Sequence, residues 1–167
     1  MNYAQIRSMD ISNGEGIGVS IFVQGCDKIP HCKGCFNPET WDFKGGKEFN
    51  SKVKEKFFEL IDKPYIKRVS ILGGEPLSKN NCYKIFLLIS EIKSKFPDKK
   101  IWIYSGYSYE NFSREQLKAI LNADVLIDGE YIEELKNPNL KFRGSLNQRV
   151  INIPETLKQN EVILYCD

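Results

Sequence analysis

The chain has 167 residues, 41% of them apolar, and its 24 lysines and arginines against 22 acidic residues give a net charge of +2. This length favours one domain, residues 1–167, because no repeat, low-complexity tract or Pro/Ser-rich linker divides the chain. The balanced charge gives no reason to expect a nucleic-acid partner. The longest apolar stretch, Ile85 to Ile89, is too short to span a bilayer, so no membrane association is expected.

Hydrophobic periodicity predicts strands that alternate with helices. The predicted strands are residues 19–23, 68–72, 100–104, 125–127, 150–153 and 162–165. The predicted helices run from Phe49 to Ile61, from about Lys79 to Phe96, and from a capping box at Ser113 through Leu121. Because parallel neighbouring strands need crossover connections, which these helices can supply, we expect an α/β fold with a mostly parallel sheet.

The length also limits how far such a sheet can close. A barrel of eight strand-helix units takes about 250 residues, so 167 residues can hold only part of one, as a curved and open sheet. In such sheets the ligand binds beyond the carboxyl ends of the strands. The segments Gly73-Gly74-Glu75-Pro76, Ser105-Gly106 and Asp128-Gly129-Glu130 are all expected at that edge.

Three cysteines, Cys26, Cys32 and Cys35, crowd the loop that follows the first predicted strand, and no fourth cysteine lies nearby in the sequence. A closed zinc site or an ordinary four-iron cluster takes four protein ligands, so three thiolates leave one coordination position open for chemistry. The alternatives are a zinc knuckle completed by His31, a disulfide or free thiols. His31 adjoins Cys32, and adjacent side chains rarely converge on one metal ion.

Cysteine usage points to a reducing compartment. The total of five is odd, and Met1 to Ser8 lacks the apolar core of an export signal, which disfavours a disulfide framework. We therefore expect a cytoplasmic location. Cys82 falls on the apolar face of the second predicted helix, so it is interpreted as a core residue.

One glycine-rich stretch is a decoy. Gly14-Glu15-Gly16-Ile17-Gly18 looks like a phosphate-binding loop, but it precedes a strand instead of linking a strand to a helix. The helix N-terminus that would bind a phosphate is therefore missing. We interpret the stretch as a lead-in to the first predicted strand that lines the entrance of the site.

Three segments together resemble the radical S-adenosylmethionine enzymes. They are residues 19–41 (VSIFVQGCDKIPHCKGCFNPETW), residues 73–76 (GGEP) and residues 142–149 (FRGSLNQR). Within that superfamily the chain is most similar to the activating proteins of anaerobic ribonucleoside-triphosphate reductase, and the resemblance covers nearly its whole length. The spacing departs from the usual pattern, because five residues instead of three separate Cys26 from Cys32. A surface loop can absorb two extra residues at small entropic cost.

The resemblance implies a ligand set. Cys26, Cys32 and Cys35 would bind three irons of a [4Fe-4S] cluster, whose fourth iron takes S-adenosylmethionine. Gly73, Gly74 and Glu75 would receive the amino group of that cofactor, because glycine permits close backbone approach and a carboxylate complements an ammonium. Further residues are implied as contacts of the adenine ring or as weaker candidates for the same pocket: Gly34, Cys35 and Phe36 for the adenine, then Asn37, Ser105 and Gly106.

Two interpretations are open for each of four charged residues. Arg143 and Arg149 could bind a cofactor carboxylate or an acidic partner surface. Asp128 and Glu130 could hydrogen-bond a ribose or cap the segment that follows the fourth predicted strand. The sequence does not decide between these roles.

The resemblance also implies an activity. Reductive cleavage of S-adenosylmethionine would generate a glycyl radical on anaerobic ribonucleoside-triphosphate reductase, with an electron from a low-potential donor such as flavodoxin or ferredoxin. One alternative is an activase of another glycyl-radical enzyme, such as pyruvate formate-lyase, or modification of a small molecule. Another is a non-catalytic iron-sulfur electron carrier or a zinc-stabilised binding module.

The three-cysteine loop generates a first prediction. Changing Cys26, Cys32 or Cys35 to alanine should abolish cluster assembly and cofactor cleavage, because each thiolate holds a different iron. Cys82→Ala, Cys166→Ala and His31→Ala should retain both properties. Iron and sulfide content after anaerobic reconstitution is the measurement, and a requirement for Cys82, Cys166 or His31 would contradict the open-site interpretation.

Overall fold

One sheet of eight strands forms the frame of the computed structural model, which describes residues 1–166. The strands are β1 (Asn2–Asp10), β2 (Gly18–Val23), β3 (Lys47–Glu48), β4 (Arg68–Gly73), β5 (Lys100–Tyr104), β6 (Val125–Asp128), β7 (Arg149–Asn152) and β8 (Leu164–Cys166). The helices are α1 (Ser51–Ile61), α2 (Cys82–Lys95), α3 (Arg114–Ile120) and α4 (Ile153–Gln159), with 3-10 turns η1 (Pro38–Thr40), η2 (Tyr109–Asn111) and η3 (Glu133–Leu135).

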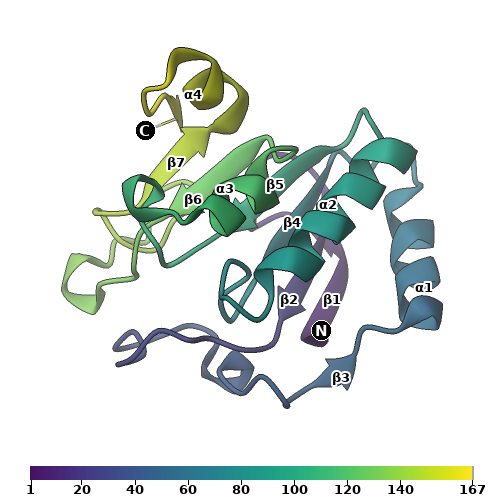
Figure 1. Ribbon diagram of the computed structural model, residues 1–167, viewed down its shortest axis with the longest axis horizontal. Helices are drawn as coiled ribbons and strands as arrows, with labels where there is room; N and C mark the ends of the chain where they lie inside the picture. Colours follow the sequence, from purple (N-terminus) through teal and green to yellow (C-terminus); the bar gives the residue numbers. More distant parts are fainter. Residues whose placement is uncertain (167) are drawn as a thin grey trace.

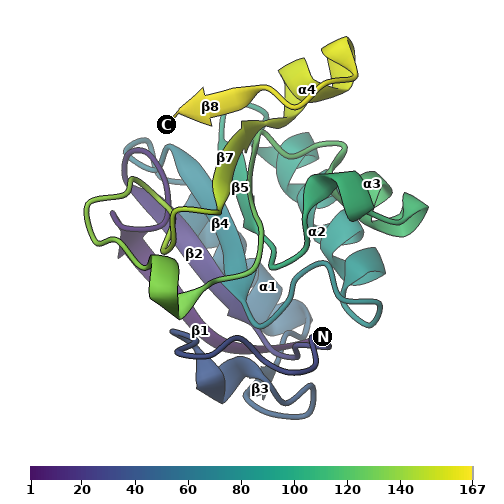
Figure 2. The same ribbon diagram turned by 90° about the vertical axis from the view of Figure 1, so that its left-hand side faces the viewer.

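The sheet is mixed and open, in the order β3-β1-β2-β4-β5-β6-β7-β8. Strands β2, β4, β5 and β6 are parallel, whereas β1, β3, β7 and β8 pair antiparallel at the two sides. Helices α1, α2 and α3 cover one face of the sheet, and the segment 129–148 crosses the other face (Figures 1 and 2). This inner face therefore carries loops where a closed barrel would have its interior.

Local signals explain the elements that were predicted. The Asn50 side chain caps α1 by accepting a hydrogen bond from the Val53 N–H at 3.1 Å. The predicted capping box of α3 is present, with Ser113 and Gln116 bonding reciprocally. Helix α2 turns apolar residues such as Ile85 and Ile92 into the core, where they are fully buried. The predicted α/β architecture with a partial, open sheet is confirmed.

The two sides of the sheet differ from the sequence prediction. Strand β1 was not predicted, because most of its side chains are exposed or half-buried and its sequence has no apolar run. Strand β7 ends at Asn152, and Ile153 begins α4, which was also not predicted and is capped by the Asn152 side chain. Strand β7 runs antiparallel to β6, and no crossover α-helix connects these two strands. Strand β8 runs antiparallel to β7, with α4 between them.

None of the helices in residues 1–166 is long and apolar enough to cross a membrane.

A buried ion pair anchors the turn between β1 and β2 over the sheet. Arg68 at the start of β4 is fully buried, and its Nη2 lies 3.2 Å from the Asp10 carboxylate and 2.8 Å from the Asp10 carbonyl. Its Nη1 donates to Ser70 Oγ at 2.6 Å. Asp10 in turn accepts from the Ser12 and Asn13 N–H groups, which fixes the turn. The glycine-rich stretch predicted to be a decoy is therefore a strand connection, without a helix N-terminus.

The ion pair generates a stability prediction. Arg68→Met should lower the free energy of unfolding by about 3–5 kcal/mol, because it leaves the Asp10 carboxylate buried without its partner. Chemical denaturation measures the loss. The exposed Arg114 is the matched control, and Arg114→Met should stay within about 0.5 kcal/mol of the unaltered protein. Equal effects of the two substitutions would contradict a structural role for the pair.

Candidate metal and cofactor site

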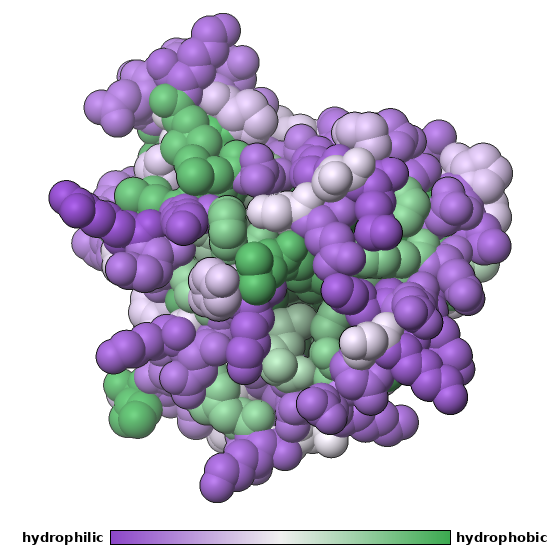
Figure 3. Space-filling model, turned by 45° about the vertical axis from the view of Figure 1, so that its right-hand side comes forward, coloured by the Kyte–Doolittle hydropathy of each residue, from purple (hydrophilic) through white to green (hydrophobic). Residues whose placement is uncertain are grey.

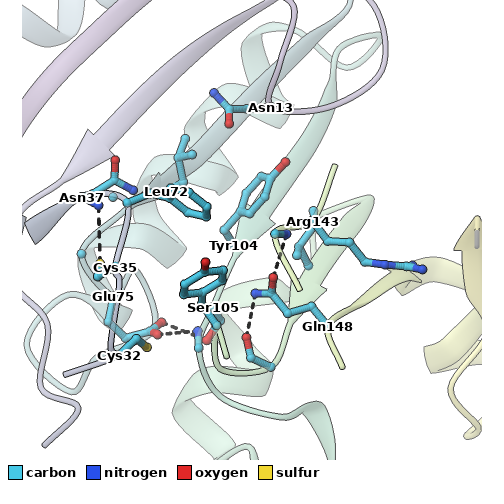
Figure 4. A pocket seen from close by; sticks show the side chains of 18 of the residues that line it. Asn13, Cys32, Cys35, Asn37, Leu72, Glu75, Tyr104, Ser105, Arg143 and Gln148 are labelled. Carbon is cyan, nitrogen blue, oxygen red and sulfur yellow. Dashed lines mark hydrogen bonds between the residues drawn. The ribbon is translucent and has the colours of Figure 1, made fainter. Parts of the chain in front are cut away.

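A cavity of about 640 Å³ opens at the carboxyl ends of the parallel strands β2, β4, β5 and β6 (Figure 4). Nearly every residue predicted from the sequence to bind the cluster or the cofactor lines it. Those residues are Cys26, Cys32, Cys35, Phe36, Asn37, Gly73, Gly74, Glu75, Ser105 and Gly106. Gly34 does not line the cavity, and a side chain at this position would overlap the carboxylate of Glu133.

Main-chain hydrogen bonds hold the cysteine loop at the end of β2. The Gly25 N–H donates to the Thr40 carbonyl at 2.8 Å, and the Cys26 N–H donates to the Trp41 carbonyl at 3.0 Å. The Glu75 N–H donates to the Gly25 carbonyl at 2.7 Å. The loop is therefore fixed both to the η1 segment and to the turn that follows β4.

The segment between Cys26 and Cys32, which is two residues longer than the superfamily's usual spacing, is held in place by hydrogen bonds. Asp27 accepts hydrogen bonds from the Tyr107 hydroxyl at 2.7 Å and from the Lys79 N–H at 3.2 Å. Lys28 donates to the Gly106 carbonyl at 3.0 Å and lies 3.5 Å from the Glu130 carboxylate. The longer loop is thus bonded to the ends of β5 and β6.

Glycines in the turn after β4 are required by this close packing. A Cβ atom at Gly74 would clash with the Gly25 carbonyl and lie 2.7 Å from the Thr40 carbonyl. Gly73 has a φ of +117°, and a Cβ there would lie 2.6 Å from the backbone of Val23. The sequence prediction explained these glycines by approach to a ligand. The structure shows that Gly73 allows the chain to approach the end of β2, and that Gly74 allows it to approach the cysteine loop.

Glu75 is buried and bonded at both carboxylate oxygens. Its Oε1 accepts from the Leu77 N–H and the Ser105 hydroxyl, each at 2.9 Å, and its Oε2 accepts from the Gly106 N–H at 2.7 Å. Burial raises the pKa of this carboxyl to about 7, although the three hydrogen bonds favour the charged form. One acceptor position remains on Oε2, on the wall of the cavity.

The three cysteines fit a cluster better than a single ion. Among residues 1–166, no three His, Cys, Asp or Glu side chains converge on a point that could hold one metal ion. In an iron-sulfur cluster each cysteine binds a different iron, so the sulfurs need not converge. The His31 ring stacks on Trp41 with centroids 4.1 Å apart. The structure thus brings the thiols of Cys26, Cys32 and Cys35 to the wall of one cavity.

The protonation state of the cysteine thiols affects the uptake of an iron-sulfur cluster. Burial raises the pKa of Cys26 to about 11, and burial also raises the pKa of Cys32. Both thiols are therefore protonated at neutral pH in the protein without metal. Because thiolates are the metal ligands, cluster binding must displace these protons.

The remaining two cysteines lie elsewhere. Cys82 is buried at the start of α2 and lines a separate cavity of about 830 Å³ between α2 and α3. The face that Figure 3 shows has a hollow with hydrophobic residues inside and hydrophilic residues around it. Cys166 lies in β8 at the edge of the sheet, opposite Val150. The interpretation of Cys82 as a core residue is confirmed.

Two of the four charged residues that the sequence left open, Arg149 and Asp128, are bonded to each other. Arg149 donates to both oxygens of Glu110 at 2.8 Å and to the buried Asp128 carboxylate. These hydrogen bonds lower the pKa of Glu110 to about 2. Asp128 also accepts from the Tyr109 N–H at 2.9 Å, so it caps the segment after β5. Of the two arginines considered, only Arg143 lines the cavity.

Sequence reasoning missed two lining residues that matter. Gln148 accepts hydrogen bonds from the Gly144 and Ser145 N–H groups and donates to the Gly129 carbonyl at 2.9 Å, so it braces the segment that crosses the inner face. In the sequence, the glutamine-containing stretch 142–149 indicates only the resemblance to the superfamily. Tyr104, the last residue of β5, also lines the cavity. Its position at a strand's carboxyl end was the available signal.

These features define an iron-sulfur protein of the radical S-adenosylmethionine class. The family described as "4Fe-4S single cluster domain" matches residues 12–151. The anaerobic ribonucleoside-triphosphate reductase-activating protein of Escherichia coli K12 is 36% identical over 152 residues, which cover 90% of this chain and 97% of the relative. The proteins of the same name from phage T4 and Vibrio cholerae are 38% and 35% identical, over 90% and 89% of this chain and 93% and 96% of their own length. The chain belongs to this family of activating proteins.

The packing around Gly74 generates a prediction. Gly74→Ala should destabilise the protein by about 2 kcal/mol and reduce its iron content after reconstitution, because the added methyl displaces the backbone next to Cys26. Gly106→Ala is the control, since a Cβ there meets no backbone atom: it lies 2.9 Å from the flexible Lys28 side chain and 3.4 Å from Glu75 Oε2. Iron and sulfide analysis together with chemical denaturation measures both. Full iron loading of Gly74→Ala would show that the close approach is not needed for the cluster.

Proposed function

We propose that this protein installs a glycyl radical on an anaerobic ribonucleoside-triphosphate reductase, using a [4Fe-4S] cluster and S-adenosylmethionine. The observation that carries the proposal is the donor set of the cavity: three cysteines from one loop, and no fourth, beside the Gly73-Gly74-Glu75 turn. The names of the relatives point to the same substrate protein. Residues 1–167 are proposed to form one domain, in agreement with the single sheet.

In this proposal Cys26, Cys32 and Cys35 hold three irons, which leaves the fourth iron for the cofactor. When bound, the cluster supplies the electron that cleaves S-adenosylmethionine, and the cleavage provides the radical that removes a hydrogen atom from glycine. The protein's own task is to position these groups and to exclude competing reactions.

The residues of the turn after β4 suit the cofactor's amino group. Glu75 lines the cavity, and its Oε2 keeps one acceptor position to which an ammonium can donate a charge-assisted hydrogen bond. Ser105 and Gly106 hold the Glu75 carboxylate in place, so its orientation is set before the ligand arrives. Phe36, with 60% of its surface exposed, offers a ring face to the adenine.

The source of the electron and the cellular location of the reaction complete the proposal. The cleavage consumes one electron, and we assign its delivery to a low-potential protein such as a flavodoxin or a ferredoxin. We place the reaction in the cytoplasm, because the three thiols must stay reduced to take up the cluster.

The proposal predicts a radical on a protein partner. Under reducing, oxygen-free conditions with the cognate reductase, electron paramagnetic resonance should show a glycyl radical on the reductase. Its doublet should collapse when glycine is deuterated at Cα, because the splitting arises from that hydrogen. Cys26→Ala should abolish the signal, whereas the matched variant Cys82→Ala should retain it.

Two outcomes would reject this assignment. One is turnover of a nucleotide or another small molecule without any protein partner. The other is cleavage of S-adenosylmethionine with no radical on the cognate reductase, in which case a radical on a different glycyl-radical enzyme would name the true substrate. Failure to cleave the cofactor at all, with a fully loaded cluster, would indicate a non-catalytic iron-sulfur protein.

A further inference from the structure

The cavity extends well beyond the residues assigned to the cluster and the cofactor. Cys32, Cys35 and Glu75 lie together at one end of it in Figure 4, whereas Asn13 lies at the opposite end. The Tyr104 side chain lies between them, and its hydroxyl points away from the cysteines and toward Asn13 (Figure 4). This second end has no role in the ligand set described above.

The Tyr104 hydroxyl is buried and has no hydrogen-bond partner among the described residues. Burial raises the pKa of this phenol well above its usual value, so it stays protonated and can donate. A buried donor without a partner is costly, and such groups in native proteins call for a ligand or another polar partner. Tyr104 lines a cavity that a ligand can enter, so the partner can come from outside the chain.

The lining of the cavity bears on what that partner can be. Phe22, Leu72, Ile127 and Phe142 line it with apolar side chains, and polar residues such as Asn13 and Arg143 line it as well. A peptide that enters loses water from its N–H and C=O groups, and these groups then need new partners. A glycine segment has no side chain at its centre, so its main-chain groups dominate the contact.

We propose that this end of the cavity is a peptide-binding subsite, in which the Tyr104 hydroxyl donates a hydrogen bond to a main-chain carbonyl of the glycine segment inserted by the partner protein. The inference rests on the proposed function, since it concerns the segment whose glycine loses a hydrogen atom. It adds a residue that recognises the partner and takes no part in binding the cluster.

Tyr104→Phe tests the subsite, because it removes only the hydroxyl. Cleavage of S-adenosylmethionine by dithionite in the absence of reductase should be unchanged. The reductase concentration that gives half-maximal glycyl radical formation should rise about tenfold, as expected for one buried hydrogen bond lost with its acceptor left unpaired. Tyr83→Phe is the matched control, because Tyr83 is 67% exposed on α2 and lines the other cavity.

A second measurement identifies the acceptor. A synthetic peptide that spans the reductase's glycine segment should compete with the reductase for the protein. Replacing each of the two amides that flank the glycine with an ester, in turn, weakens one carbonyl as an acceptor. One of these esters should inhibit the unaltered protein severalfold less than the all-amide peptide does. The same ester should inhibit Tyr104→Phe as well as the all-amide peptide does, because this variant already lacks the hydroxyl that donates to the carbonyl.

The results separate this inference from the proposed function. Equal activation of the reductase by Tyr104→Phe and the unaltered protein, or equal effects of both esters on both proteins, would overturn the subsite. Impaired cofactor cleavage by Tyr104→Phe without reductase would also overturn it, by placing Tyr104 in the cofactor pocket. Absence of any glycyl radical with the unaltered protein would instead reject the proposed function.

Discussion

The cysteine loop and the turn after β4 are in direct main-chain contact, and the rest of the site depends on that contact. The Glu75 N–H bonds to the Gly25 carbonyl, and Gly74 packs where a Cβ atom would strike the backbone beside Cys26. The residues proposed to bind the cluster and those proposed to bind the cofactor are therefore joined by main-chain contacts. A displacement of either segment moves the other, which is how protein groups can be held at the geometry that radical chemistry requires.

The Glu75 carboxylate extends these contacts to the third strand of the parallel group. It accepts hydrogen bonds from Ser105 and Gly106 at the end of β5, and from Leu77 in its own turn. Lys28 reaches the same region by bonding to the Gly106 carbonyl. The longer cysteine loop is thereby braced from two directions, so its extra length need not make the cluster site mobile.

In the proposed function, the partner protein reaches the cavity from the inner face of the sheet. No α-helix in the described chain covers this face, which the segment 129–148, with its 3-10 turn η3, crosses and where Gln148 braces it (Figure 2). The Arg149 interactions with Asp128 and Glu110 fix the end of that loop to β6 and to the segment after β5. An open sheet with a braced loop leaves a cavity that a flexible protein segment can enter, whereas a closed barrel would shield it.

The sequence by itself determined the central strands, the helices α1 to α3 and the three-cysteine donor set, because these depend on periodicity, capping residues and residue type over short spans. It also predicted that the ends of the parallel strands would meet at one edge. Only the tertiary structure decided the antiparallel sides of the sheet, since β1 is largely polar and β7 returns without a crossover helix. It also showed that Gly74 packs against Gly25, which lies far away in the sequence. The orphaned Tyr104 hydroxyl became visible for the same reason, because burial and missing partners are properties of the packed chain and leave no local mark in the sequence.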